Sequence, residues 1–520
     1  MLESHSLPSD IAQLHRFILE LEGSYSDIIH ALQSELEESE ARYQALLEEI
    51  RLARHHRFGR SSEASPDQGD LFNEAEQECD AEDKPELETV TYERKKPSKG
   101  RPPLPSHLPR EEVILDIPEE AKSCACCGHE LHKMGEERSE KLEFIPAKLL
   151  VKEFVRPKYS CRHCEQTQTQ VKIVMAPPEP SIIPKGIATP SLLAQIITNK
   201  FHYALPLYRQ ESVFTRLGIA LSRQTMSQWL MKCAEALAPL MALLKAELLK
   251  QGVLFADETT LNVLDNGRAK SYIWVYGCGS DRNGCSQSPS IVLFDYQDGS
   301  RGAHCPVNYL QGFQGYLQVD GYQAYEDTDA TLVGCLAHAR RKFVEAEKCL
   351  PANAKKKPGK VQWALSQFKK LYKIERLLRG ASPEEVVKKR QQDALPILKE
   401  FKVWLDKSVS QVLPKSKLGE AIRYCLNQWT KLIRYVDDGR LSIDNNRAER
   451  SVRPFAVGRK NWLFAKTHSG AEASAMLYSL VETAKANGRE PYEYIEYVLR
   501  ELPRIEPGGD YSVLLPWNSS

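Results

Sequence analysis

The stretch Val253–Thr259, which reads VLFADET, decides the fold that we expect for this chain. Its first four residues are apolar, as is typical of a short buried strand, and this strand is expected to end on Asp257. Further strands are predicted at Ser271–Tyr276 and Ser290–Phe294, and a helical stretch at Cys305–Leu310. The middle of the chain is therefore expected to be a sheet with interspersed helices.

A fourth strand is predicted at Gly315–Val319, and it ends on Asp320. A fifth strand follows at Thr331–Cys335, and a helix begins near His338. This succession is the order of a ribonuclease-H-like mixed sheet, in which the first and fourth strands lie side by side. Asp257 and Asp320 would then face each other across a short gap, where two carboxylates are suitable oxygen ligands for Mg²⁺.

A third ligand is expected in the stretch Asp444–Arg453, because phosphoryl transfer by two metal ions needs more than two carboxylates. On a helix, Asn445, Glu449 and Arg453 share one face at intervals of four residues. Such a face combines a metal ligand with groups that bind phosphate. Asp444 is the competing carboxylate, although its place ahead of this run suits a helix N-cap better. A single aspartate at the end of a strand is usually part of a turn. The predicted metal site therefore depends on Asp257, Asp320 and Glu449 occurring together in this order of strands.

Two C-x₂-C pairs predict a structural zinc site with four thiolate ligands, Cys124, Cys127, Cys161 and Cys164. Four thiolates leave no open coordination position, so a catalytic zinc ion is not expected. Cys126 lies within the first pair and is a further candidate ligand. The alternative is that the four cysteines bind no metal.

The N-terminal segment has apolar residues at alternating intervals of three and four, which predicts a coiled coil. An interval of four then introduces a stutter. The alternative is an amphipathic helix packed against its own protein. The pattern comprises Ile11, Leu14, Ile18, Leu21, Tyr25, Ile28 and Leu32, and it continues with Leu36, Tyr43, Leu46 and Ile50.

A helix-turn-helix is predicted after the zinc segment. The first helix starts near Leu205, a turn follows at Gly218, and the second helix begins after the capping residue Ser222. Two core helices joined by a glycine turn explain the pattern equally well. In the DNA-binding interpretation, the residues near the start of the second helix, where base-contacting side chains belong, are Arg223, Gln224 and Ser227.

The charges are balanced overall, with 70 basic and 70 acidic residues, but they are unevenly distributed. Residues 1–93 hold 23 acidic and 7 basic residues, a net charge of −16, whereas residues 94–520 hold 63 basic and 47 acidic residues, a net charge of +16. A basic surplus of this size is compatible with a nucleic-acid partner. No apolar run is long enough for a membrane span, and the thirteen scattered cysteines suggest the cytosol rather than a disulfide-rich secreted protein.

Several motifs together resemble the DDE transposases of the insertion-sequence sixty-six family. They are FADET around Asp257, QVDGY around Asp320, GCLAHARRKF with His338 and Arg341, and DNNRAER with Glu449. The likeness is collinear over almost the whole chain. It includes the leucine-zipper-like helix ending in RFGRSSE, the cysteine pairs and LPLYR at 205–209.

The resemblance implies a catalytic triad of Asp257, Asp320 and Glu449 that binds two Mg²⁺ ions, with Mn²⁺ as a possible substitute. It also implies that other polar side chains support this site or bind DNA phosphates. We assign that role to His338, Arg341, Asn445, Arg450 and Arg453.

The long interval before Glu449 resembles the family's helical insertion. Residues 340–402 hold eighteen basic and seven acidic residues, with Trp363, Phe368 and Tyr372 among them. This composition predicts a helical surface that faces DNA, and an ordinary solvated helix face is the alternative for any individual lysine.

The resulting expectation is a multidomain α+β protein. It comprises a coiled-coil helix (1–62), a disordered linker that is acidic and then basic (63–118), a zinc-binding domain (119–178) and a helix-turn-helix-like region (190–248). A ribonuclease-H-like catalytic domain (250–470, insertion about 345–435) and a C-terminal helical segment with a tail (471–520) follow.

The function expected for this protein is that of a transposase that cleaves and joins DNA at the ends of an insertion sequence. Its expected partners are double-stranded DNA, a second copy of the chain and accessory proteins of the same element, in the nucleoid-associated cytoplasm of a bacterium. The alternatives are a ribonuclease-H-like nuclease or resolvase without strand transfer, and a zinc-bearing DNA-binding regulator without catalysis.

Overall fold

A computed structural model describes residues 10–58, 149–159, 173–268, 270–279, 289–351 and 359–518. The chain forms two compact units, one comprising residues 1–84 and 178–520 and the other residues 85–177. In the described residues of the smaller unit, β1 (Lys158–Tyr159) pairs antiparallel with β2 (Val174–Met175). The four predicted zinc ligands and the predicted linker lie outside the described residues.

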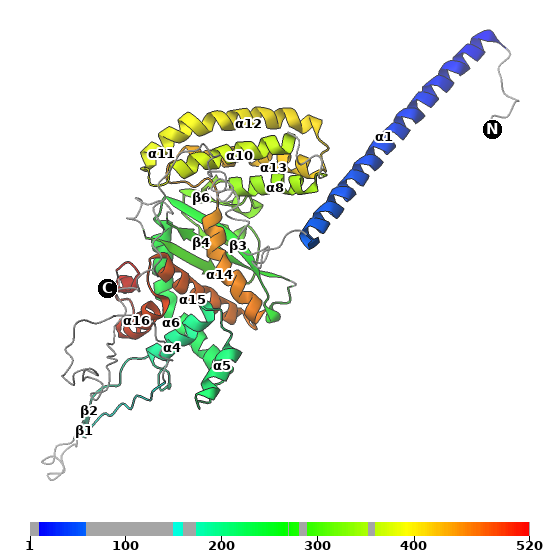
Figure 1. The fold of residues 1–520 in the computed structure, drawn as a ribbon. Helices are drawn as coiled ribbons and strands as arrows, with labels where there is room; N and C mark the ends of the chain where they lie inside the picture. Colours follow the sequence, from blue (N-terminus) through cyan, green and yellow to red (C-terminus); the bar gives the residue numbers. More distant parts are fainter. Residues whose placement is uncertain are drawn as a thin grey trace, which may run out of the picture. The chain divides into compact units, whose positions relative to one another are not determined.

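The larger unit is built on a five-stranded mixed sheet with the order β5-β4-β3-β6-β7 (Figure 1). The first and fourth predicted strands are neighbours, as expected, because β3 and β6 pair in parallel from Val253↔Tyr316 to Phe255↔Gln318. Strand β4 pairs antiparallel with both of its neighbours, β3 and β5, and β6 pairs with β7 in parallel. The strand bounds are β3 Val253–Leu261, β4 Ser271–Cys278, β5 Ile291–Asp295, β6 Tyr316–Gln318 and β7 Thr331–Val333.

One prediction about the first strand is wrong, because β3 does not end at Asp257 but continues to Leu261. Its second half includes two threonines, which favour extended backbone, and it pairs with β4 as far as Leu261↔Ser271. Asp257 therefore lies in the middle of a rigid strand, at the point where the pairing with β6 has stopped.

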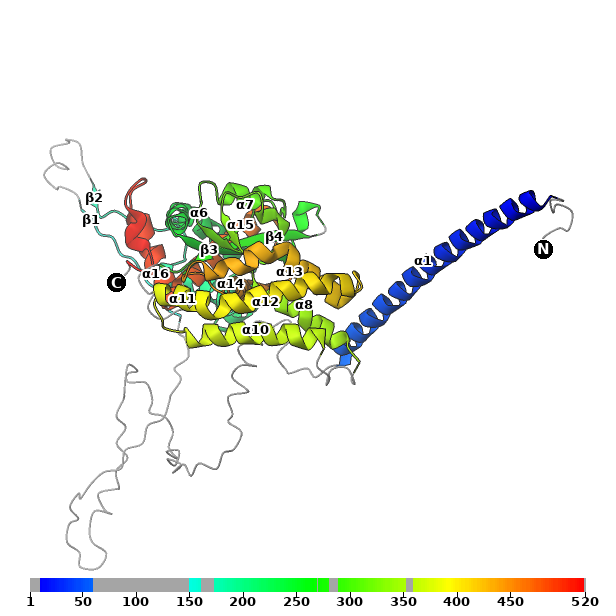
Figure 2. The ribbon, with the colours of Figure 1, turned by 90° about the horizontal axis from the view of Figure 1, so that it is seen from above.

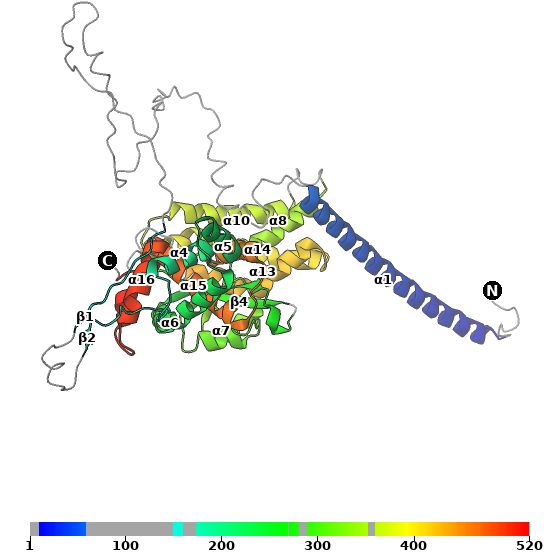
Figure 3. The same ribbon diagram turned by 90° about the horizontal axis from the view of Figure 1, so that it is seen from below.

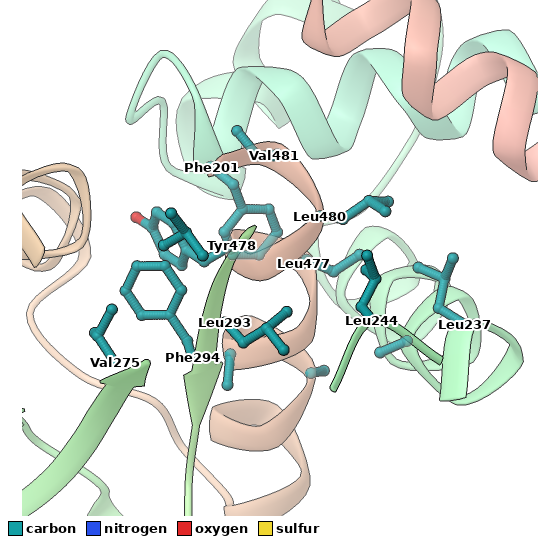
Figure 4. Packing of buried hydrophobic residues seen from close by; sticks show 14 of the residues in the cluster. Phe201, Leu237, Leu244, Val275, Leu293, Phe294, Leu477, Tyr478, Leu480 and Val481 are labelled. Carbon is teal, nitrogen blue, oxygen red and sulfur yellow. The ribbon is translucent and has the colours of Figure 1, made fainter. Parts of the chain in front are cut away.

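Helices α14 (Asn446–Trp462) and α15 (His468–Ala486) bring the C-terminal part of the chain back to this sheet. The side chains of Ser479 and Thr483 on α15 accept hydrogen bonds from the backbone N–H groups of Phe294 (2.8 Å) and Val292 (3.1 Å) in β5. Because β5 is an edge strand, α15 occupies the edge that would otherwise be open to pairing. Tyr478 packs beside Phe294 in the same cluster (Figure 4).

Three helices precede the sheet: α4 (Pro190–Phe201), α5 (Leu207–Arg216) and α6 (Arg223–Leu249). Gly218 has a φ of +82° in the turn between α5 and α6, and the Ser222 side chain caps α6 by accepting a hydrogen bond from Thr225 N–H at 3.1 Å. The predicted helix, glycine turn and capped helix are thus present. The rest of α6 is a core helix that packs against α15, while α4 packs against α16 (Pro491–Glu501) (Figure 3).

The helical insertion has its own apolar core and packs against β7 through α13. Helices α10, α12 and α13 run alongside one another (Figure 2). The predicted role of its aromatic residues is wrong: Phe368 and Tyr372 are buried, and Trp363 stacks on Trp404 at 4.8 Å inside this core. These rings stabilise the insertion rather than facing DNA. Its helices are α8 Leu336–Cys349, α10 Lys360–Leu377, α11 Pro383–Lys389, α12 Leu395–Ser408 and α13 Lys417–Ile433, and α7 His304–Tyr309 precedes them.

The N-terminal helix α1 spans Ile11–Phe58. Where the structure describes its side chains, the predicted apolar stripe is mostly exposed, from 44% at Ile50 to 86% at Ile11, and Leu21 is half-buried. The end of the helix contacts the insertion, since a Glu48 carboxylate oxygen accepts a hydrogen bond from Lys417 N–H at 2.8 Å. The described residues include no helix that is both long and apolar enough to cross a membrane.

Candidate active site

The strand register brings Asp257 and Asp320 together. The last parallel pair between β3 and β6 is Phe255↔Gln318, and each aspartate follows two residues later in its own segment. Because side chains alternate between the faces of a sheet, the two carboxylates project to the same side as Phe255 and Gln318, at adjacent positions.

Asp320 is held from both directions. Its carboxylate accepts a hydrogen bond from Tyr322 N–H at 2.9 Å, and its carbonyl accepts one from the Tyr424 hydroxyl of α13 at 2.7 Å. The intervening Gly321 has a φ of +96°, which favours glycine. A Cβ there would also lie 3.2 Å from the Tyr424 hydroxyl, so the turn after Asp320 leaves little room for a side chain.

Glu449 is brought to the same region because the start of α14 is tied to the sheet. The side-chain amide of Asn445 donates to the carbonyl of Ala256 at 2.9 Å, directly before Asp257. Gln318 of β6 donates to the carbonyl of Asp444 at 2.7 Å. Glu449 lies one turn into the helix and is buried.

The location of the carboxylates changes the pKa values of Asp257 and Glu449. Burial, together with the negative charges of Glu258, Asp320 and Glu449, raises the pKa of Asp257 well above its usual value. Burial also raises the pKa of Glu449 to about 7, although Arg341 opposes the shift. A set of buried carboxylates that destabilise one another's charged forms is an environment that favours a cation.

His338 and Arg341, which were predicted to support the site or bind DNA phosphates, lie against Glu449. Arg341 Nη2 is 3.4 Å from one Glu449 oxygen and 3.5 Å from the other, and His338 Nδ1 is 3.4 Å from the first. Burial, assisted by the Arg341 charge, lowers the pKa of His338 to about 4, so this imidazole is neutral at pH 7. Both residues are on α8. Arg341 holds the Glu449 side chain, while His338 Nε2 lies 3.1 Å from Arg341 Nη1 and its Nδ1 has no hydrogen-bond partner among the described residues.

Asp444 is engaged elsewhere. It accepts hydrogen bonds from the Tyr372 hydroxyl at 2.9 Å and from the Asn446 side chain at 3.0 Å. The prediction that Asp444 is the N-cap is wrong, because Asn445 occupies that position, although Asp444 does accept the N–H of Asn446 at 3.2 Å. Since its oxygens are committed to these partners, Glu449 is the better third carboxylate.

The donor set fits a divalent cation, but the carboxylates are not arranged as a finished metal site. Within the ranges that the structure describes, no three His, Cys, Asp or Glu side chains are placed to coordinate one ion. Glu449 is instead held by Arg341 of α8. The side-chain oxygen of Asn445 is buried without a hydrogen-bond partner beside β3, so it is a further oxygen donor for this region.

The remaining predicted residues are on the surface. Arg450 and Arg453 are exposed on α14, so they are accessible to a nucleic-acid backbone. Arg223, Gln224 and Ser227 are exposed on the first turns of α6.

One acidic residue was missed, although it is adjacent to Asp257 in the sequence. Glu258 is buried on the opposite face of β3, where Arg301 Nη2 binds it at 2.6 Å. Burial raises the pKa of Glu258, while Arg301 counteracts the effect. The motif FADET contains this carboxylate, but nothing in the sequence pairs it with Arg301.

Comparison with known proteins gives a consistent result over most of the chain. Residues 185–473 match the family described as "Transposase IS66 family", and residues 479–517 match the IS66 C-terminal element. Residues 121–165 match the zinc-finger binding domain of transposase IS66, and residues 45–113 match a family described as transposase C of IS166 homeodomain.

Relatives of similar length are known from Sinorhizobium fredii. The uncharacterized protein y4jD is 34% identical, and the match covers 99% of this chain and 98% of the relative. The uncharacterized protein y4qI is 35% identical, and the match covers 81% of this chain and 77% of the relative. These matches, together with the family segments along the sequence, show that the chain belongs to the IS66 family of transposases.

Proposed function

We propose that this protein is an active transposase that binds the ends of an insertion sequence and catalyses Mg²⁺-dependent DNA cleavage and strand transfer. The observation that carries the proposal is the register of β3 and β6, which sets Asp257 and Asp320 side by side. The strand order β5-β4-β3-β6-β7 supports a ribonuclease-H-like catalytic domain. The charge of Glu449, which contributes to the raised pKa of Asp257, supports its place as the third carboxylate.

In this proposal, Asp257, Asp320 and Glu449 would hold two Mg²⁺ ions, or Mn²⁺. Bound there, the ions would supply charge stabilisation at the scissile phosphate and lower the pKa of the attacking water. Arg341, which lies against His338, keeps the Glu449 carboxylate oriented. Exposed Arg450 and Arg453 bind the DNA backbone. The liberated 3′-hydroxyl would then attack a phosphodiester of target DNA, forming a new P–O bond while the bond to the 3′-oxygen of the target strand breaks and that oxygen leaves as a hydroxyl group.

Purified full-length protein, Mg²⁺ and a duplex that carries one end of the element test this function. A strand-joined product supports transposition, whereas cleavage without joining supports a ribonuclease-H-like nuclease or resolvase. Binding without either product supports a DNA-binding regulator. Omission of the divalent cation is expected to abolish both cleavage and joining.

We further propose a structural zinc ion bound by Cys124, Cys127, Cys161 and Cys164. The match of residues 121–165 to a zinc-finger family supports it. Metal analysis of the purified protein is expected to give about one zinc ion per chain. Cys124→Ser should lose this zinc, whereas Cys79→Ser, at a cysteine outside both pairs, should retain it. Wild-type protein free of stoichiometric zinc contradicts the site.

The exposed start of α6 is proposed to contact the DNA at the element end. Arg223→Ala combined with Gln224→Ala is expected to weaken binding of this duplex roughly tenfold or more, because both base and phosphate contacts are lost. Fluorescence anisotropy at fixed salt measures the effect. The control is Arg500→Ala, which removes an exposed arginine of α16. Equal affinities of the double variant and the control would exclude the start of α6 as a DNA-binding surface.

Helix α1 is proposed to pair two copies of the chain as a coiled coil, because its apolar stripe is exposed along the helix. Sedimentation is expected to show a concentration-dependent oligomer. Ile28→Glu with Leu32→Glu should raise the dissociation constant by roughly a hundredfold or more, since charges would enter the apolar seam. Gln33→Glu with Ser34→Glu, beside the stripe, should have little effect. An oligomer that is insensitive to both double variants contradicts the role of α1.

A further inference from the structure

Arg301 is held beside the candidate active site in a fixed orientation. It lies between β5 and α7, and its Nε and Nη2 donate to one Glu258 oxygen at 3.2 and 2.6 Å. The other Glu258 oxygen accepts a hydrogen bond from the Tyr325 hydroxyl at 3.3 Å. The Glu258 side chain is only 4% exposed, whereas that of Arg301 is 43% exposed. A buried carboxylate therefore anchors a guanidinium that remains accessible to solvent.

Two tyrosine rings complete this arrangement. The guanidinium carbon of Arg301 is 4.1 Å from the ring centroid of Tyr322 and 4.9 Å from that of Tyr272. The Tyr322 hydroxyl donates to the Arg301 carbonyl at 3.0 Å, so backbone and side chain are both fixed. Among the contacts of the described residues, none uses Arg301 Nη1 as a hydrogen-bond donor. One edge of a rigid guanidinium is thus available to a ligand.

The arginine is linked directly to both strands of the site. Glu258 follows Asp257, and Tyr322 N–H donates to the Asp320 carboxylate at 2.9 Å. Arg301 is therefore linked through Glu258 and Tyr322 to the chain segments that carry Asp257 and Asp320, where negative charges would otherwise repel a DNA backbone.

We propose that Arg301 is a binding residue for a DNA phosphodiester next to the cleavage position, with Tyr272 and Tyr322 orienting it. The inference rests on the proposed function, because it assigns the phosphate to the DNA strand in that site. A guanidinium with free donors binds phosphate oxygens through charge-assisted hydrogen bonds. The competing explanation is that Arg301 only neutralises the buried Glu258 carboxylate, and the test separates the two.

The experiment measures binding of end-containing duplexes to full-length protein in EDTA, so that no cleavage is required. Each duplex carries one neutral methylphosphonate near the cleavage position. For the wild type, one such replacement is expected to weaken binding roughly tenfold. Arg301→Gln should bind the unmodified duplex roughly tenfold more weakly and show no further loss at that phosphate. The slope of its log affinity against log salt concentration should decrease by about one, as expected for the loss of one phosphate contact.

Two further variants exclude a purely structural effect. Arg500→Gln is a matched control, because Arg500 is 45% exposed, binds Glu501 at 3.0 Å and lies 6.0 Å from the Tyr497 ring. It should retain the wild-type profile. Arg301→Gln combined with Glu258→Gln leaves no unpaired buried carboxylate, so this double variant should fold even if the single variant does not. Like the single variant, it should show no further loss of binding at the methylphosphonate position.

The results also separate this inference from the proposed function. The phosphate contact is overturned if no single methylphosphonate weakens binding to the wild type. It is also overturned if both Arg301 variants respond to the methylphosphonates and to salt as the wild type does. If the wild type neither cleaves nor joins DNA in Mg²⁺ but the profile depends on Arg301, the enzymatic function fails and the phosphate contact stands.

Discussion

Asp257→Asn is expected to reduce cleavage of the end-containing duplex by roughly a thousandfold or more, while DNA binding is retained. Asparagine keeps the shape of the side chain but removes the charge that would bind a metal ion. Asp257 lies within β3, which continues four residues beyond it to Leu261, so the backbone should not change. Gel analysis of cleavage and anisotropy of binding measure the two properties separately.

The same variant is expected to be more stable than the wild type in EDTA. The pKa of Asp257 is raised in the folded protein, so the folded state binds its proton more tightly than the unfolded chain does. The stability from this proton is fully present below the unfolded pKa and is lost as the pH rises through the raised folded pKa. Asp257→Asn removes that loss. Its melting temperature at pH 8 should exceed the wild-type value by roughly 2–5 °C, and the difference should vanish towards pH 4.

Asp265→Asn is the control for both measurements, because Asp265 is an exposed carboxylate in the turn after β3. It should cleave and melt as the wild type does. Wild-type cleavage by Asp257→Asn would remove Asp257 from the site. A lower melting temperature at pH 8 would contradict the electrostatic explanation.

Arg390→Met is expected to have the largest effect on stability, a loss of about 3–5 kcal/mol in the free energy of unfolding of the insertion. Arg390 is fully buried, and its Nε and Nη2 each donate to a Glu375 oxygen at 2.7 Å. Its guanidinium also donates to three backbone carbonyls in the segment that leads to α14, those of Tyr435, Asp438 and Leu441. The variant leaves the Glu375 carboxylate and these carbonyls without their donor.

Chemical denaturation followed by tryptophan fluorescence measures this loss, because Trp363 and Trp404 are part of the core of the insertion. Lys389→Met is the matched control. Lys389 pairs with Asp393 at 3.5 Å on the surface, where an ion pair contributes little. Arg390→Met with Glu375→Leu should regain part of the stability, since no buried charge remains unpaired. An unfolding curve of Arg390→Met that matches the wild type would exclude Arg390 as a structural centre of the insertion.

The proximity of Asp257 and Asp320 could be predicted because it depends on local information. An apolar run before each aspartate marks a strand, and the order of strands and helices places the two strands together. The adjacency of β3 and β6 confirmed this part of the prediction. Gly218 and Ser222 likewise allowed the turn and the start of α6 to be predicted, because both act locally: Gly218 through its own backbone conformation and Ser222 through a side-chain hydrogen bond to Thr225 N–H.

Contacts between distant segments could not be predicted in this way. The hydrogen bond from Asn445 to Ala256 and the approach of Arg341 to Glu449 join residues more than a hundred positions apart. The basic composition of the insertion was compatible with a DNA-facing surface, but it did not reveal that Phe368 and Tyr372 point into a core. Burial of a helix face depends on partners that a short window of sequence does not contain.

The late position of α14 and α15 in the chain has a consequence for protein synthesis. A ribosome delivers Asp257 and Asp320 well before Glu449, and α15, which occupies the edge of β5, emerges later still. A polypeptide released within the insertion lacks the third carboxylate of the proposed site and leaves the β5 edge open to other chains. Premature termination in this region is therefore expected to yield aggregation-prone fragments in which the proposed site is incomplete.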